Sequence, residues 1–148
     1  MPKLDLESVP QNNRTGYPSP FDEAVRERWV RRLSPVIGFA DFGASHVTLK
    51  PGAASSQRHW HEQEDELVVM LSGIAVLIDD KGRTPLNAGD IAIFPKNDGN
   101  GHHLINESVE DCVFVAIGRP PGGLCHYPDI DLMVGQDMRY AHKDGTPN

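Results

Sequence analysis

Short apolar runs separated by glycine-containing turns extend from residue 34 to residue 118, and this spacing limits the possible fold more than any other feature. The candidate strands are 36–43, 46–50, 54–61, 66–71, 74–79, 84–87, 91–95, 102–107 and 112–118. Turn residues separate them, for example KPG at 50–52, SG at 72–73 and NDGNG at 97–101. Regularly spaced short strands with such turns predict an all-β sandwich or barrel.

The segments on either side of the strands have a different character. Residues 1–20 are polar and contain four prolines, which is typical of an extended arm without a core of its own. Residues 21–33 have a helical rhythm after a possible Ser19 cap, which predicts a short helix. A chain of 148 residues is expected to form one domain. Its parts are arm and helix at 1–33, barrel at 34–119 and an irregular tail at 120–148.

The acidic balance of the chain argues against several classes of partner. The formal net charge is −7 and the pI is about 5.4, whereas nucleic acids and anionic membranes attract a concentrated basic face. No apolar run reaches the ~20 residues of a membrane span. The first residues, MPKLDLESVP, carry acids and a proline in place of the apolar region of a signal peptide. We therefore expect a cytoplasmic protein that binds neither nucleic acid nor membranes.

The arginines and cysteines are the other candidates for chemistry. Four arginines lie in and near the predicted helix, and we interpret them as its solvated face. They are Arg26, Arg28, Arg31 and Arg32. Cys112 and Cys125 are expected to be free structural thiols, because cytosolic proteins rarely form disulfides.

The stretch QRHWHEQEDE places two histidines two positions apart. Residues at this spacing share one face of a strand, so His59 and His61 can aim both imidazoles at one point. Glu66 opens the next strand and can bring its carboxylate there. His102 or His103 can supply a third imidazole, since one of these neighbours must face inward. Three imidazoles and one carboxylate suit a first-row divalent ion, namely Fe, Mn, Ni, Co, Cu or Zn.

The residues around these histidines resemble the two motifs of the cupin family. The motifs read Gly52-x6-His59-x-His61-x4-Glu66-x6-Gly73 and Gly89-x5-Pro95-x6-His102-x3-Asn106. Compared with the family pattern, the turns before His59 and His102 are longer, but no ligand is lost. The three-residue spacing to Asn106 favours His102 over His103 as the fourth ligand.

This resemblance implies a fold, a cofactor and partners. Cupins are double-sheet jelly rolls that hold a metal and a small molecule in the mouth of the barrel. The family commonly pairs its barrels, so a homodimer is expected. Over nearly the whole length, segments such as YPSPF, GHHL and HYPDIDL are similar to bacterial single-domain cupins of unassigned function. Some of these are labelled sugar-phosphate-isomerase-like.

Other residues are expected to surround the ligands. Candidates for the pocket wall or for hydrogen bonds to a ligand ring are Gln57, Met70, Phe94 and His103. Met70 and Phe94 also suit the core, and Asn106 suits structural hydrogen bonds. The acids expected to lie in a solvated turn are Glu62, Glu64 and Asp65. Tail residues that can fold over the barrel mouth are Tyr127, Asp129 and Asp131. The histidines interpreted as ordinary surface residues are His46, His126 and His142.

Functions of different classes agree with these patterns. The first is a metal-dependent enzyme acting on a polar small molecule, either an isomerase or lyase or a dioxygenase, with Glu66 as a possible base. The alternative is a binding module that senses or stores a ligand without turnover. A metal-free structural cupin is a third reading. One fold hosts many functions, so the choice depends on the site.

Overall fold

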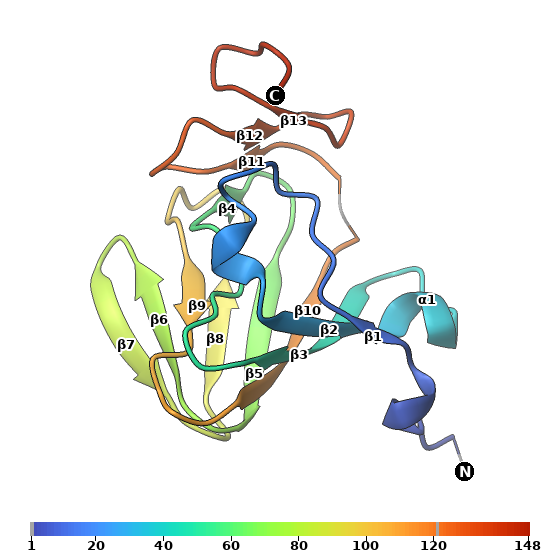
Figure 1. Cartoon of the computed structure of the whole chain (residues 1–148). Helices are drawn as coiled ribbons and strands as arrows, with labels where there is room; N and C mark the ends of the chain where they lie inside the picture. Colours follow the sequence, from blue (N-terminus) through green and yellow to red (C-terminus); the bar gives the residue numbers. More distant parts are fainter. Residues whose placement is uncertain (1, 121) are drawn as a thin grey trace.

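The computed structural model describes residues 2–120 and 122–148 (Figure 1). This part of the chain contains mostly short strands, one five-residue α-helix and two 3-10 turns. The elements are η1 (Leu6–Ser8), β1 (Gln11–Asn12), η2 (Glu23–Val25), β2 (Arg28–Arg32), α1 (Leu33–Ile37), β3 (Gly43–Leu49), β4 (Trp60–His61), β5 (Glu66–Ser72), β6 (Ala75–Asp79), β7 (Gly82–Leu86), β8 (Ile91–Phe94), β9 (His103–Ile105), β10 (Cys112–Gly118), β11 (Cys125–His126), β12 (Met133–Val134) and β13 (Tyr140–Ala141). None of the described helices is long and apolar enough to cross a membrane.

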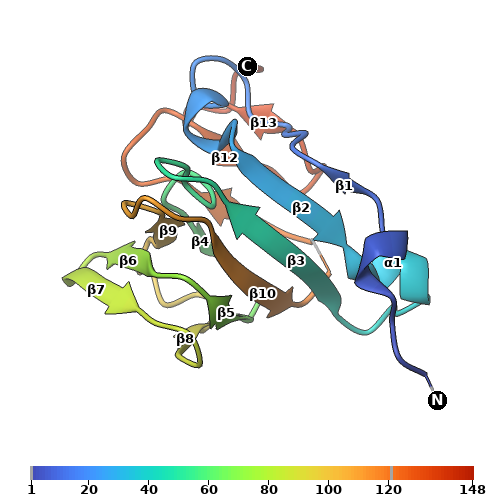
Figure 2. The same ribbon diagram turned by 60° about the horizontal axis from the view of Figure 1, so that its bottom comes forward.

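The strands form three antiparallel sheets. One has six strands in the order β1-β2-β3-β10-β5-β8, one has three in the order β7-β6-β9, and one has four in the order β13-β12-β11-β4. Figures 1 and 2 show the first two sheets as the walls of a barrel, and Figure 1 shows the third across one end of it. The prediction of an all-β jelly roll is therefore confirmed.

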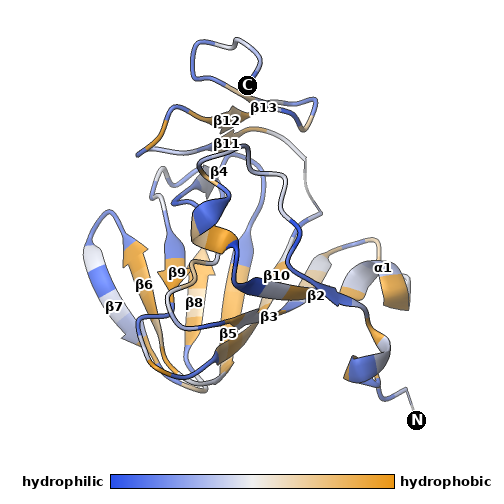
Figure 3. Cartoon of the chain, viewed as in Figure 1, coloured by the Kyte–Doolittle hydropathy of each residue, from blue (hydrophilic) through white to orange (hydrophobic). Residues whose placement is uncertain are grey.

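The main core lies between the two walls of the barrel. Side chains alternate along each strand, as a pleated strand requires. On β5, for example, Val68 and Met70 are almost fully buried, whereas Leu71 remains 49% exposed. Figure 3 shows β5, β6 and β8 mainly in the colour of hydrophobic residues, whereas β7 is largely hydrophilic. The buried members of this cluster are Val47, Leu49, Ala53, Val68, Met70, Ala75, Leu86, Ala92, Phe94, Leu104, Cys112 and Phe114.

A second apolar cluster joins the two ends of the chain. Its buried members from the tail are Cys125, Tyr127, Leu132 and Val134. Tyr17 and Phe21 of the arm pack against them. The arm also adds β1 to the edge of β2 and buries Val9 completely. The arm thus has no separate core and is held by the barrel and the tail. The arm and the tail together cover one end of the barrel.

The prediction of a helix at residues 21–33 is wrong. This segment forms the 3-10 turn η2 and then strand β2, and the short α-helix follows at Leu33–Ile37. Successive side chains of the β2 sequence RWVRR point to opposite faces of the sheet. Pairing with β3 over five residues decides the conformation of this segment. The arginines of β2 are therefore not a solvated helix face.

Three other expectations about strands need correction. Residues 36–43 contain the end of α1 and a loop in place of a strand. Within 54–61, the strand β4 comprises Trp60–His61, and residues 55–58 form bends. The tail, expected to be irregular, contributes β11, β12 and β13.

Candidate metal centre

His59 and His61 lie in a short segment at the end of the barrel that pairs with two other segments. β4 pairs with β11, and His59 forms an isolated antiparallel bridge with His102. The centroid of the His59 ring lies 4.8 Å from that of His61 and 4.9 Å from that of His102. Trp60, between the two motif histidines, stacks on His126 instead, with 4.3 Å between centroids. Two local pairings therefore bring the three imidazoles together.

Glu66, the first residue of β5, completes this group. Its Oε2 lies 4.0 Å from His61 Nε2, and its Oε1 lies 3.7 Å from His102 Nε2. Burial raises the pKa of Glu66, but His102 and the other two imidazoles outweigh burial and hold the pKa below its usual value. Glu66 is therefore an ionised carboxylate at neutral pH, which is the form that binds a metal.

The rings of His59 and His102 are anchored through Nδ1. His59 Nδ1 lies 2.9 Å from the Gln57 carbonyl oxygen, and His102 Nδ1 lies 3.3 Å from the Asn100 carbonyl oxygen. A proton shared with these carbonyls leaves Nε2 with its lone pair, as in known metal-binding histidines. Burial, with a smaller contribution from His102, lowers the pKa of His59 to about 3. The neutral imidazole is the form that coordinates a metal.

His61 is oriented by a carboxylate. Its Nδ1 lies 2.5 Å from Oε2 of Glu64, whose side chain is only 12% exposed. Burial lowers the pKa of His61, but Cys125 and Glu64 outweigh this effect and raise the pKa to about 10. The expectation that Glu64 belongs to a solvated turn is therefore wrong. A carboxylate behind a ligand histidine fixes its ring orientation and increases its basicity.

The two neighbouring histidines face opposite sides, as adjacent strand positions require. His102 is 4% exposed, and its ring stacks on Phe94 with 3.6 Å between centroids and 3° between planes. His103 lies on β9, where its Nδ1 is 3.0 Å from the Ser56 carbonyl oxygen. His102 is thus the histidine placed beside Glu66. His103 supports the loop that carries His59.

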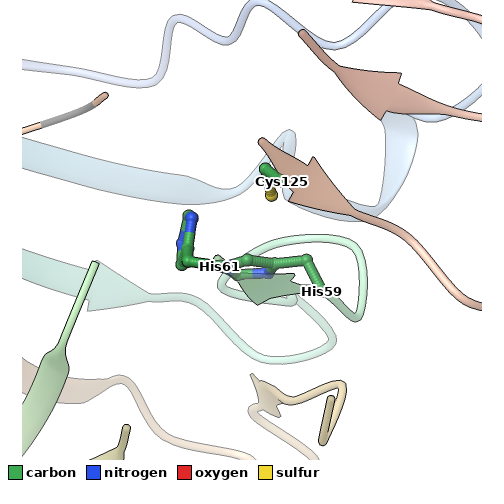
Figure 4. A group of neighbouring side chains, drawn as sticks. All are labelled: His59, His61 and Cys125. Atoms are coloured by element: carbon green, nitrogen blue, oxygen red, sulfur yellow. The ribbon is translucent and has the colours of Figure 1, made fainter. Parts of the chain in front are cut away.

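Cys125 also reaches the site, although the sequence offers no signal for it. β11 places Cys125 directly opposite His61. One ligand atom from each of His59, His61 and Cys125 lies within 4.8 Å of the other two (Figure 4). These three residues could therefore hold a metal ion. The sequence predicts a structural role for this thiol and gives no indication that it lies beside two candidate ligands.

Two predicted neighbours of the site have other roles. The Gln57 side chain donates a hydrogen bond of 2.9 Å to the Phe21 carbonyl and so fastens the arm. The carbonyl of Gln57, and not its side chain, supports the His59 ring. Met70 is 1% exposed within the main core, away from the ligands.

Two adjacent cavities meet at Glu66. The inner cavity, about 210 Å³, lies between the barrel walls and is lined by His59, Glu66 and His102 among others. The outer cavity, about 330 Å³, lies under the tail and is lined by His61, Glu66 and Cys125 among others. The candidate ligands thus face space that can admit a small molecule.

The tail covers this end of the barrel. Tyr127 is 4% exposed, and its ring centroid lies 5.9 Å from that of His59. Asp129 receives two hydrogen bonds of 2.7 Å from the Arg58 guanidinium, which fasten the tail to the barrel. Asp131 lies further away and bonds His142. Only Tyr127 of these three tail residues lies against the candidate ligands.

Comparison with known proteins identifies the family. The model of the cupin domain matches residues 45–118. A structure of a sugar phosphate isomerase from the cupin superfamily, from Silicibacter pomeroyi, is 36% identical to this chain. The match covers 99% of this chain and 96% of that one, with a TM-score of 0.93. The chain belongs to the cupin family.

Other relatives of this cupin are more distant. A proposed sugar phosphate isomerase from Acidithiobacillus ferrooxidans is 25% identical, over 77% of this chain and 74% of that one, with a TM-score of 0.71. The polyketide cyclase RemF from Streptomyces resistomycificus is 18% identical, over 88% and 87% of the two chains, with a TM-score of 0.70, and shares the fold. No curated protein matches the chain at a significant level.

The donor set of this cupin suits the metal that the fold implies. His102 Nε2 is buried and has no hydrogen-bond partner among the described residues, which is costly unless another group satisfies it. The nitrogen, oxygen and sulfur donors around it match the preferences of divalent transition ions. We conclude that these residues are chemically suited to such an ion.

Proposed function

We propose that this cupin binds one divalent transition ion through His59, His61, Glu66 and His102 and acts on a polar small molecule as an isomerase or lyase. The arrangement of the three rings supports this proposal most directly. Each ring has its Nδ1 held by a carbonyl or carboxylate, and Glu66 lies beside the Nε2 atoms of two of them. The similarity to the Silicibacter pomeroyi protein supports the reaction class.

In such a reaction, the bound ion supplies Lewis acidity that polarises a carbonyl group of the substrate. Glu66 is ionised and borders both cavities, so its carboxylate, once released from the ion, can accept a proton from a carbon next to that carbonyl. The buried rings and the covering tail restrict water around this position. Elemental analysis would identify the ion, and product analysis under air would show whether the protein reacts with dioxygen.

Replacing Glu66 by Gln is expected to separate binding from turnover. Gln keeps the size of the side chain but cannot accept a proton, so a ligand found by a thermal-shift screen of sugar phosphates and hydroxy acids should still bind. Turnover of that ligand should fall by about 10²–10⁴-fold, the usual contribution of a general base. Product formation is followed by NMR, and metal content by elemental analysis of the same samples.

Glu62→Gln is the matched control, because Glu62 lies in the segment just before β5 and contacts His126, 2.7 Å away, outside the candidate ligands. Full turnover in Glu66→Gln would remove Glu66 as the base. A ligand that stabilises wild type but is recovered unchanged would favour the binding module over the enzyme.

We further propose that this cupin is a cytoplasmic homodimer that pairs through the outer face of the six-stranded sheet. Ile91 and Ile93 on the edge strand β8 are 61% and 69% exposed, and Leu71 on the adjacent β5 is 49% exposed. An exposed apolar patch of this kind on a sheet face is prone to be covered by another chain. A second copy of the chain carries the same apolar patch, so two copies related by a two-fold axis can cover each other's patch.

The Ile93→Glu variant is expected to be monomeric at micromolar concentration, because two carboxylates would be brought together in the apolar contact. Sedimentation velocity measures the change. Val109→Glu is the control, since Val109 is 93% exposed in a turn outside this face. A wild-type monomer, or an Ile93→Glu dimer, would contradict the proposed interface.

A further inference from the structure

Strand β2 directs two arginines into the inner cavity. Arg28, Val30 and Arg32 occupy alternate positions of β2 and all line this cavity, as expected for residues on one face of a strand. Arg31 points the other way and bonds the arm at Glu7 and Val9. The cavity therefore has an arginine wall from β2 and a wall of candidate metal ligands.

The environment of Arg28 is unusual for a cation. Its Nη1 donates a hydrogen bond of 2.7 Å to the Ser55 carbonyl, but its Nε is buried and lacks a partner among the described residues. Burial also lowers the pKa of Arg28. A partly buried charge without a carboxylate is costly to maintain, and an anionic ligand would offset that cost.

Several other arginines of the chain are held by carboxylates, although Arg119, which lines the outer cavity, donates to the Gln63 carbonyl instead. Arg31, Arg58 and Arg83 each pair with at least one carboxylate. Within residues 2–120 and 122–148, neither Arg28 nor Arg32 has such a pair. Arg32 lines both cavities beside Glu66, so its guanidinium is accessible to a molecule that occupies either one.

The charge balance of the inner cavity is the reverse of that of the whole chain. The chain carries a formal charge of −7. The inner cavity, however, is lined by two guanidinium groups and a single carboxylate, Glu66. A divalent ion at the candidate ligands would add further positive charge. A cavity with this balance favours anions and disfavours neutral sugars.

We infer that Arg28 and Arg32 hold the anionic group, a phosphate or carboxylate, of a small substrate. The reactive end of this substrate then faces His59, Glu66 and His102, and this orientation rests on the proposed function. Guanidinium groups bind both types of anion through paired hydrogen bonds. The volume of about 210 Å³ is below the ~300–1,000 Å³ of pockets for drug-sized ligands, so the substrate is small.

Isothermal titration calorimetry with inorganic phosphate and with malonate tests the inference at constant ionic strength. The full-length chain is titrated after chelation and again after loading with Mn(II). We expect one of the two anions to bind in both states, since the arginines belong to the protein. Arg32→Gln should weaken that binding by about tenfold to a hundredfold, as expected for a lost charged hydrogen bond. Preference for phosphate would indicate a phosphorylated substrate, and preference for malonate a carboxylic acid.

Arg26→Gln is the matched control, because Arg26 is exposed and lines neither cavity. Arg28→Gln is tested as well, and its thermal unfolding shows whether it folds. If it does not fold, Arg32→Gln, at the exposed end of β2, decides the result. No anion binding in wild type, or equal binding in Arg32→Gln and Arg26→Gln, would overturn the inference. Metal content of the same samples separates the two proposals, since metal without anion binding removes only the anion site. Anion binding without metal supports the anion site and removes the proposed metal chemistry.

Discussion

The His59→Ala/His61→Ala double variant is expected to lose its bound metal, and with it the stabilisation that the metal provides. Removing even an outer partner of a metal ligand lowers affinity by about 10–100-fold, and removing two ligands should lower it further. For wild type, metal at about a hundredfold excess over Kd adds about 2.7 kcal/mol to the free energy of unfolding. For a chain of this size, that raises Tm by about 5–10 °C.

Elemental analysis and thermal unfolding with Fe(II), Mn(II) or Zn(II) measure both effects. The His46→Ala/His142→Ala variant removes two imidazoles outside the site and should retain both the metal and the rise in Tm. A cobalt-loaded sample adds information about Cys125. A thiolate-to-cobalt absorption band that disappears in Cys125→Ser, but persists in Cys112→Ser, would add sulfur to the ligand set. Wild type that binds no metal would leave the metal-free reading of this cupin.

The Asn106→Ala variant is expected to destabilise the fold by about 2–5 kcal/mol. Asn106 is fully buried, and its amide nitrogen donates to the carbonyls of Leu49 and Glu110 at 2.8 and 2.7 Å. Its Oδ1 accepts hydrogen bonds from the backbone and hydroxyl of Ser108 at 3.0 and 2.7 Å. Alanine leaves a buried carbonyl unsatisfied and releases the turn between β9 and β10.

Urea unfolding measures this change as a lower midpoint with an unchanged slope m. Asn87→Ala is the control, because Asn87 is exposed and its side chain makes no hydrogen bond within the described residues. A loss below about 0.5 kcal/mol, the range of ordinary surface substitutions, would contradict the structural role of Asn106. Asn106→Asp should be at least as damaging, since it places an acceptor against two carbonyl oxygens.

The parts of the fold that the sequence predicts best are continuous apolar runs bounded by turn residues. Strands at 66–71, 74–79 and 112–118 correspond closely to β5, β6 and β10. The spacing of two positions between His59 and His61 likewise predicts that they share one face of a strand. The structure brings His59, His61, Glu66 and His102 together, whereas their role as ligands remains a prediction.

The parts that local reasoning missed depend on pairing between distant segments. RWVRR can be read as a helix face or as a strand, and only its register with β3 directs Arg28 and Arg32 into the cavity. Cys125 reaches His61 because β11 pairs with β4, and neither strand exceeds two residues. Such short strands have almost no signal of their own, so their position is decided by the tertiary structure.

The pairing of β4 with β11 also determines when this site can be completed during protein synthesis. The two histidine motifs leave the ribosome before the segment that contains β11, so an unfinished chain has the imidazoles but lacks the strand that holds His61 in place. Tyr17 and Phe21 are made first, yet they must wait for Tyr127 and Leu132 to form their cluster. The candidate site is therefore completed late in synthesis, after the segment that contains β11 has emerged and can pair with β4.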